Sequence, residues 1–199
     1  MIAVRVLKVE ETKNIAALHQ MAFDNFFLTS LGTKFLGEFY GSIIKSKDGV
    51  AIGAYNEKNE LVGFAIGARV KKGFYKNILK NNFIPLSYTA STSLIKKPEK
   101  IIRLIKSFLT TETSNDNFLN YASLLSICVD PEKKGQKIGK HLLLAFESEV
   151  IKFSDGITLT TDKWNNDYVN HFYFSNNYIL TDHFNQGDRP MNFYVKKLK

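Results

Sequence analysis

The chain has 199 residues, of which 44% are hydrophobic and 13% are aromatic, so it can bury one sizeable core and is not a disordered chain. One cysteine and four histidines exclude an internal disulfide framework and argue against a structural zinc site, so we expect no metal. No apolar run reaches the roughly 18 residues of a membrane span, and the N-terminus lacks the features of a signal peptide, so we expect a cytoplasmic protein.

The positive charge is concentrated in one part of the chain. The formal net charge is +8, and the segment 69–106 alone has ten basic residues and one acidic residue, a net charge of +9. The rest of the chain is therefore close to neutral. This distribution indicates a local anionic partner rather than a generally basic protein.

The first third of the chain predicts a strand, two amphipathic helices and a β-hairpin. Apolar residues recur at three- and four-residue steps in both helices, and Thr12 is a candidate N-cap for the first. Apolar segments on either side of the polar turn NEKNE predict the hairpin. The expected ranges are 3–8 for the strand, 12–28 and 32–45 for the helices, and 50–55 and 61–70 for the hairpin.

A basic insert over about 71–117 interrupts this order, with two short amphipathic helices around Pro85 and Pro98. The apolar run 121–129 then suits a strand buried on both faces. The ranges that follow are 136–152 and 166–175 for helices, and 156–161, 178–184 and 191–198 for strands. We therefore expect a single α/β (α+β) domain over 1–199. It should have a mixed central sheet of about six to seven strands flanked by helices, with the helical insert between strands 3 and 4.

The segment from Ile127 to Leu143 has the features of a phosphate-binding turn. A buried strand ends at Val129, Pro131 ends its backbone pairing, and a loop rich in lysine and glycine leads into a helix. The free N–H groups and the dipole at a helix start favour an anion. From these residues alone, a solvated basic turn is an equally good interpretation.

The same residues resemble the acetyl-CoA motif of the GNAT superfamily, whose consensus is V-x-P-x-x-(R/Q)-G-x-G-(I/L)-G-x-x-L-L. The residues in register are Val129, Pro131, Gly135, Ile138, Gly139, Leu142 and Leu143. Lys134 replaces the usual arginine or glutamine. Lys137 replaces a glycine, which would either crowd the pyrophosphate or add a cation beside it.

A second segment resembles the family pattern N-x-x-A-x-x-x-Y-x-x-x-G-F. The matching residues are Asn166, Val169, Phe172 and Tyr173, with Asn177 and Tyr178 in place of the glycine and the phenylalanine. Asparagine suits a glycine position because it tolerates left-handed backbone angles. Two partial motifs in the right order indicate a GNAT fold, and the resemblance is specific over 124–178.

The resemblance implies an acyltransferase that moves an acetyl group from acetyl-CoA to a primary amine by direct attack. Backbone groups of Ile127, Cys128 and Val129 would pair with the pantetheine arm of the co-substrate. Asn166 would hydrogen-bond the same arm, and Tyr173 would lie beside the sulfur as the general acid. The N–H groups expected to hold the pyrophosphate belong to Lys134, Gly135, Gln136, Lys137, Ile138, Gly139 and Lys140.

The general base is the least defined part of this site. The two central strands, 121–129 and 156–161, contain no carboxylate, so Asp162 is the first candidate, with Asp182 and His183 behind it. Each of these residues also suits a purely structural role. A single cysteine on a strand is typical of a small buried residue rather than of a nucleophile.

The basic insert gives the nearest clue to the acceptor. A phosphate-bearing small molecule, such as an amino sugar, would explain its charge, and so would transient contact with an anionic membrane surface or a solvated basic flap. A nucleic-acid partner is disfavoured because base-stacking motifs are absent. Two other functions stay open: a catalytically weak sensor that binds acyl-CoA, and an acetyltransferase of a protein or peptide amine. The family also suggests a homodimer.

Overall fold

The computed structural model describes residues 2–24, 26, 28–82 and 116–199. A seven-stranded sheet runs through it in the order β1-β2-β3-β4-β5-β7-β6. The strands are β1 (Ala3–Val6), β2 (Gly49–Tyr55), β3 (Leu61–Ala68), β4 (Ala122–Val129), β5 (Gly156–Asp162), β6 (Ile179–Gln186) and β7 (Arg189–Lys197). Neighbouring strands are antiparallel except for the parallel pair β4–β5. The expected mixed α/β sheet is confirmed.

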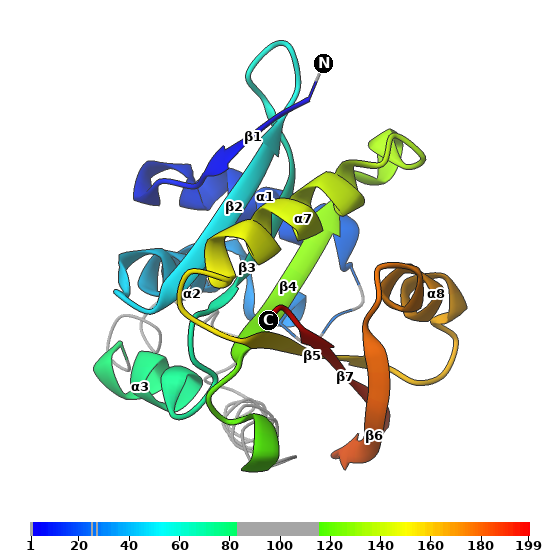
Figure 1. The fold of residues 1–199 in the computed structure, drawn as a ribbon. Coiled ribbons are helices and arrows are strands. Elements are labelled where there is room, and N and C mark those ends of the chain that lie inside the picture. Colours follow the sequence, from blue (N-terminus) through cyan, green and yellow to red (C-terminus); the bar gives the residue numbers. More distant parts are fainter. Residues whose placement is uncertain (1, 25, 27, 83–115) are drawn as a thin grey trace.

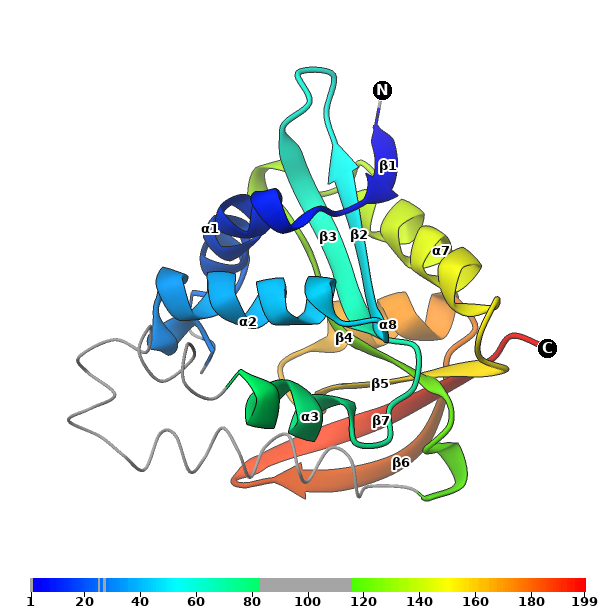
Figure 2. The same cartoon turned by 90° about the vertical axis from the view of Figure 1, so that its left-hand side faces the viewer.

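Helices cover both faces of the sheet, and each face has its own apolar cluster (Figures 1 and 2). On one face lie α1 (Thr12–Ala22), α2 (Thr33–Lys45) and α3 (Phe74–Asn81). On the other lie α7 (Ile138–Val150) and α8 (Asp167–Ser175). Short 3₁₀ turns occupy Val9–Glu11, Thr29–Leu31, Asp116–Phe118 and Pro131–Lys133. None of the helices in the described ranges is long and apolar enough to cross a membrane.

Several element ends differ from the predictions. The first helix stops at Ala22 rather than near residue 28, and Thr12 is its first residue rather than its cap. α7 begins at Ile138 instead of residue 136, because the residue before it has a left-handed φ of 59°. Within the insert, the first predicted helix is confirmed as α3. The second, around Pro98, lies outside the described residues.

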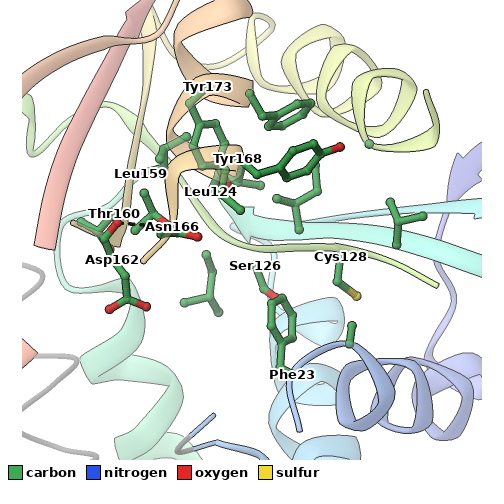
Figure 3. A pocket seen from close by; sticks show the side chains of 18 of the residues that line it. Phe23, Leu124, Ser126, Cys128, Leu159, Thr160, Asp162, Asn166, Tyr168 and Tyr173 are labelled. Carbon is green, nitrogen blue, oxygen red and sulfur yellow. Dashed lines mark hydrogen bonds between the residues drawn. The ribbon is translucent and has the colours of Figure 1, made fainter. Parts of the chain in front are cut away.

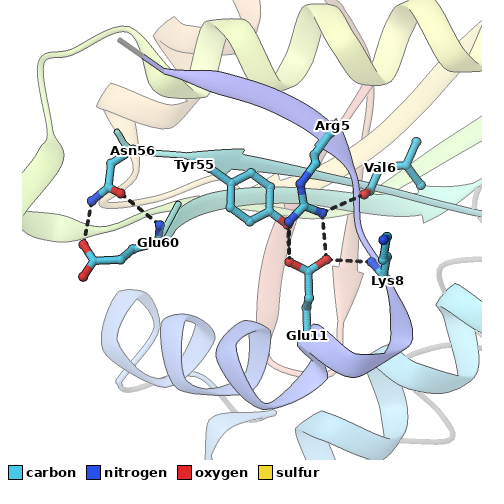
Figure 4. Close-up of polar contacts among 7 residues, drawn as sticks. All are labelled: Arg5, Val6, Lys8, Glu11, Tyr55, Asn56 and Glu60. Atoms are coloured by element: carbon cyan, nitrogen blue, oxygen red, sulfur yellow. Dashed lines mark hydrogen bonds and ion pairs between the residues drawn. The ribbon is translucent and has the colours of Figure 1, made fainter. Parts of the chain in front are cut away.

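A polar cluster joins β1, the start of α1 and β2 (Figure 4). The Arg5 guanidinium donates to both carboxylate oxygens of Glu11, at 3.0 and 2.9 Å. The Tyr55 hydroxyl and the Lys8 backbone N–H donate to the same carboxylate, at 2.6 and 2.8 Å. Burial alone would raise the pKa of Glu11, but these three partners outweigh it and lower the pKa to about 2. Because Glu11 directly precedes α1, the cluster fixes where this helix starts.

Candidate active site

The sheet opens between its two central parallel strands. β4 and β5 pair only from Ala122 to Leu124 on one strand and from Ile157 to Leu159 on the other. Beyond these residues β4 continues to Val129 beside β3, whereas β5 continues beside β7, so the two strands diverge (Figure 1). The edges that face the gap are therefore left without a ladder partner among the described strands.

An irregularity in β4 sets which side chains face which side of the gap. The β3–β4 register shifts so that Leu125 is an extra residue on β4, a β-bulge. After the bulge, Cys128 belongs to the cluster under α1 and α2, while Ile127 and Val129 pack against the cluster under α7. Ser126 also faces the α1–α2 side, where its side chain lies near Tyr40 of α2.

A cavity of about 680 Å³ lies at this gap. Its walls come from β4, β5, β7, the loop 133–140, α8 and the end of α1. Tyr168 and Tyr173 lie on one side of β4, and Phe23 and Ser126 lie on the other (Figure 3). Two ligands can therefore meet in the gap from opposite faces of the sheet.

One end of the cavity is suited to an anion. It is lined by the loop between β4 and α7, including Gly135 and Gly139, and by the first turn of α7, whose N–H groups have no side-chain cap. The lysines that line this end are Lys133, Lys134, Lys137 and Lys140. A Cβ added at Gly139 would meet nothing of the chain closer than 3.7 Å, so the packing of the protein itself does not require glycine there.

Lys137 has a left-handed backbone, with φ of 59° and ψ of 15°, and its side chain is exposed. Gly135 also has a positive φ, 84°. The conformation at Lys137 costs a non-glycine residue roughly 1–2 kcal/mol. This explains why the family prefers glycine at the equivalent position, and it shows that the departure noted in the sequence leaves the turn intact.

Tyr173 is buried on α8 and lines the cavity. Its ring packs against those of Tyr178 and Tyr194, with centroids 5.7 and 5.9 Å away. Burial, with a smaller contribution from Tyr194, raises the pKa of Tyr173 well above its ordinary value. The phenol therefore carries its proton throughout the physiological pH range.

Asn166 is the residue before α8, and it also lines the cavity. Its Nδ2 donates to the Thr161 hydroxyl at 2.7 Å and to the Asp162 carbonyl at 3.1 Å, which holds the side chain against the end of β5. The motif residues Asn166 and Tyr173, together with Lys137 and Gly139, are thus brought to one cavity.

Asp162, the first candidate for the base, lines the cavity as well, but its carboxylate is already engaged. Arg189 donates to Oδ1 through Nε and Nη2, at 3.0 and 2.8 Å, and to Oδ2 through Nη2 at 2.6 Å. Arg189 thus occupies both oxygens of this carboxylate, and the role of Asp162 as a base stays a prediction. Asp182 and His183 do not line the cavity, and both are exposed on β6.

The structure adds a buried histidine that sequence reasoning missed. His19 of α1 lines the cavity, and its Nδ1 lies 2.8 Å from the hydroxyl of the fully buried Tyr40. Its Nε2 is buried and has no hydrogen-bond partner in the described structure. Burial lowers the pKa of His19 to about 4, so the ring is neutral at pH 7. The available signal was a titratable residue on the apolar stripe of an amphipathic helix, beside Ile15 and Leu18.

Cys128 is buried, and burial raises the pKa of its thiol well above the usual range. A reactive cysteine needs the opposite shift, which agrees with the expected role as a small core residue. Within the described ranges there is no group of three or more histidine, cysteine, aspartate or glutamate side chains that could hold a metal ion.

Comparison with known proteins agrees with this geometry. The model of the acetyltransferase (GNAT) family matches residues 12–175. A search of proteins with curated descriptions finds no match.

Solved structures of several N-acetyltransferases have the same fold. The ribosomal-protein-S18-alanine N-acetyltransferase from Escherichia coli is 12% identical, with a TM-score of 0.61 over 100% of this chain and 94% of that chain. The PaiA N-acetyltransferase from Thermoplasma acidophilum, in complex with coenzyme A, is 17% identical, with a TM-score of 0.60 over 99% of each chain. The spermidine/spermine N-acetyltransferase SpeG from Vibrio cholerae is 13% identical, with a TM-score of 0.56 over 99% and 95%.

Proposed function

The chain belongs to the acetyltransferase (GNAT) family of acyltransferases, which use acetyl-CoA, and we propose that it acetylates a primary amine by direct attack in the gap between β4 and β5. The observation that supports this most is the gap itself. Its edge at β4 is unpaired beyond Leu124, a lysine-rich helix start lies at one end, and Tyr173 lies in its wall.

These residues fit acetyl-CoA as co-substrate. The open edge of β4 at Ile127, Cys128 and Val129 offers backbone groups to an extended pantetheine arm, as a neighbouring strand would. The amides from Lys134 to Lys140 and the surrounding lysines suit the pyrophosphate. The space beside Gly139, which the chain leaves open, allows a close approach to the helix start. Asn166 uses its Nδ2 for Thr161 and Asp162, so its Oδ1 is the group for an amide N–H of the arm.

A few groups of the chain would polarise the thioester and protonate the leaving sulfur. Acetyl-CoA supplies an activated thioester. A backbone N–H of Cys128 or Val129 donates to the thioester oxygen, where charge develops during attack. Tyr173 keeps its proton because it is buried, and it donates this proton to the departing sulfur.

For the acceptor we propose a small amine with a phosphate group, such as an amino sugar. The cavity wall includes the cations Lys71 and Arg189, and Lys71 Nζ lies 4.7 Å from the centroid of the Phe193 ring. Asp162 is the single carboxylate that the described residues contribute to the wall, and it is paired with Arg189. The wall therefore has more cations than carboxylates, which favours an acceptor with an anionic group over a polyamine.

Other roles remain as alternatives to be tested. The E. coli neighbour is named for a protein substrate, so a peptide amine is the second acceptor class, and a sensor that binds acyl-CoA without turnover is a different function. Contact of the basic insert with a membrane, and a homodimer, stay predictions. Sedimentation with anionic and neutral liposomes tests the first, and light scattering tests the second.

A thiol-release assay with acetyl-CoA and four amines tests the proposed function. The amines are glucosamine 6-phosphate, glucosamine, spermidine and a peptide that begins with alanine. We expect release with the amino sugars, faster with the phosphate than without it, and product mass spectra that show one added acetyl group. Preference for the peptide or for spermidine would overturn the acceptor class. Binding of acetyl-CoA with no release on any amine would favour the sensor.

A further inference from the structure

The side chain of Asn170 on α8 makes four hydrogen bonds beside the cavity, and the proposed mechanism does not use it. Its Nδ2 donates to the backbone carbonyls of Asp162 and Asn166, at 3.1 and 3.0 Å. Its Oδ1 accepts from Asn192 Nδ2 at 2.8 Å and from the Tyr194 hydroxyl at 3.0 Å. A backbone carbonyl can only accept, so these partners fix which end of the amide is nitrogen. Both donors of the amide and its acceptor oxygen are engaged.

Local structure places this amide between the two motif residues of α8. Asn166, Asn170 and Tyr173 follow one another at steps of four and three residues, so they share one side of the helix. On β7, Asn192 and Tyr194 are two residues apart, so they point to the same face of the sheet, and both are buried. The Tyr194 ring also packs against that of Tyr173, with centroids 5.9 Å apart. The helix and the strand therefore meet at the Asn170 amide.

The turn from β5 into α8 depends on these contacts. Asn165 has a left-handed φ of 55°, and the side chain of Asn166 does not cap the helix that follows it. The Asn166 carbonyl accepts from the backbone N–H and from the Nδ2 of Asn170, each at 3.0 Å. The Asp162 carbonyl, at the end of β5, accepts from the Nδ2 of Asn166 and of Asn170, each at 3.1 Å. Asn170 thus joins the strand end to the helix start and restricts where Asn166 can lie.

We propose that Asn170 is a positioning residue, which holds Asn166 where its Oδ1 meets an amide N–H of the pantetheine arm. The inference rests on the proposed function and goes beyond it, because the family pattern N-x-x-A-x-x-x-Y leaves the position of Asn170 open. An apolar residue of the same size could fill this space, but it would leave Asn192 Nδ2 and the Tyr194 hydroxyl without this acceptor. A network with every group engaged selects a single arrangement of the helix and the strand.

Calorimetry of the full chain with acetyl-CoA tests the inference without any amine. Asn170→Ala should lower the affinity about three- to tenfold, as expected when one hydrogen bond to the arm is weakened. His171→Gln is the matched control, because this next residue of α8 is exposed, does not line the cavity and is hydrogen-bonded to Ser175. The control should bind acetyl-CoA as the wild type does. Wild-type affinity in Asn170→Ala would overturn the inference.

A double-mutant cycle separates positioning from a merely structural role. If Asn170 acts through Asn166, the double variant Asn166→Ala with Asn170→Ala should bind acetyl-CoA within about twofold of Asn166→Ala alone. Losses that multiply would overturn the inference, because Asn170 would then affect binding by another route. Thermal melts show that each variant is folded at the temperature of the titration.

A measurement on the wild-type chain serves if Asn170→Ala does not fold. In ¹H–¹⁵N spectra, the side-chain NH₂ of Asn170 should exchange with D₂O more slowly than that of the exposed Asn165, and its signal should move when acetyl-CoA is added. Exchange as fast as that of Asn165, or a signal that acetyl-CoA leaves unchanged, would overturn the inference.

The outcomes separate the two proposals. If the wild-type chain binds no acetyl-CoA, the proposed function fails. If it binds acetyl-CoA and Asn170→Ala binds equally well, the role of Asn170 fails and the proposed function stands.

Discussion

Tyr173 is buried and lines the cavity, and its hydroxyl is the proposed proton donor to the leaving thiolate. Tyr173→Phe keeps the ring that packs against Tyr178 and Tyr194 and removes only the hydroxyl. We expect kcat to fall about 100-fold or more, while calorimetry shows acetyl-CoA affinity within about twofold of the wild type. The rate should not decline at alkaline pH through loss of this proton, because the pKa of Tyr173 is raised.

Tyr178→Phe is the matched control for that experiment. Its ring centroid lies 5.7 Å from that of Tyr173, it is equally buried, and it does not line the cavity. The control should keep the wild-type kcat. Full turnover by Tyr173→Phe would remove this residue from the proposed acid role.

Single residues also show where sequence reasoning succeeds. Asn166 directly precedes α8 and Tyr173 lies on it, and the resemblance of this segment to the family pattern predicted that both face the co-substrate; the structure places both in the wall of one cavity. His19 and Tyr40 lie on different helices, and only the fold brings the histidine ring to the Tyr40 hydroxyl. Likewise, the sequence shows Asp162 at a strand end, but not that Arg189 reaches it from β7.

At the scale of elements, the start of α7 carries backbone strain at Lys137, and the same residue is a proposed cation for the pyrophosphate. Lys137→Gly should relieve the left-handed conformation and stabilise the fold by roughly 0.5–1 kcal/mol, the strain being partly offset by the flexibility of glycine. That corresponds to a rise in Tm of about 1–4 °C for a chain of this length. The same change should weaken acetyl-CoA binding a few-fold, because one exposed cation is lost beside the proposed pyrophosphate site.

Lys137→Asn separates the two effects. Asparagine tolerates the left-handed region and carries no charge, so this variant should show the weaker binding with a smaller gain in stability. If neither variant binds acetyl-CoA less tightly, Lys137 is a tolerated exception at a glycine position and not a ligand of the pyrophosphate.

The junction of β1, α1 and β2 depends on the ionised Glu11. Its folded pKa, about 2, is below the ordinary 4.5. The stabilisation is therefore complete above pH 4.5, and it is lost as the pH falls from 4.5 toward 2. At pH 7, Glu11→Gln should lower the free energy of unfolding by about 1–3 kcal/mol, and chemical denaturation should show a weaker dependence on acid pH than in the wild type.

Glu60→Gln provides the control for this pH effect. Glu60 accepts a hydrogen bond from Asn56 at 2.7 Å in the exposed β2–β3 turn (Figure 4). Its loss should change the stability by less than about 0.5 kcal/mol. Equal effects of Glu11→Gln and Glu60→Gln would show that the junction does not depend on the ionised Glu11 carboxylate.

At the scale of the whole molecule, the sheet supports one cavity open to both of its faces. Patterns of apolar residues predicted the strands, the helices and their order, because the spacing of apolar residues along an element shows which of its faces is buried. Helix ends were less predictable: α7 starts two residues later than expected because Lys137 adopts a left-handed φ. The divergence of β4 and β5 and the bulge at Leu125 follow from strand pairing, which has no local signature.

A calorimetric titration of the full chain with acetyl-CoA tests this arrangement most directly. We expect one acetyl-CoA bound per chain, with affinity lowered by Lys137→Asn and unchanged by Tyr173→Phe. The absence of binding up to millimolar acetyl-CoA would contradict it, because the gap, the helix start and Asn166 would then have no ligand in common.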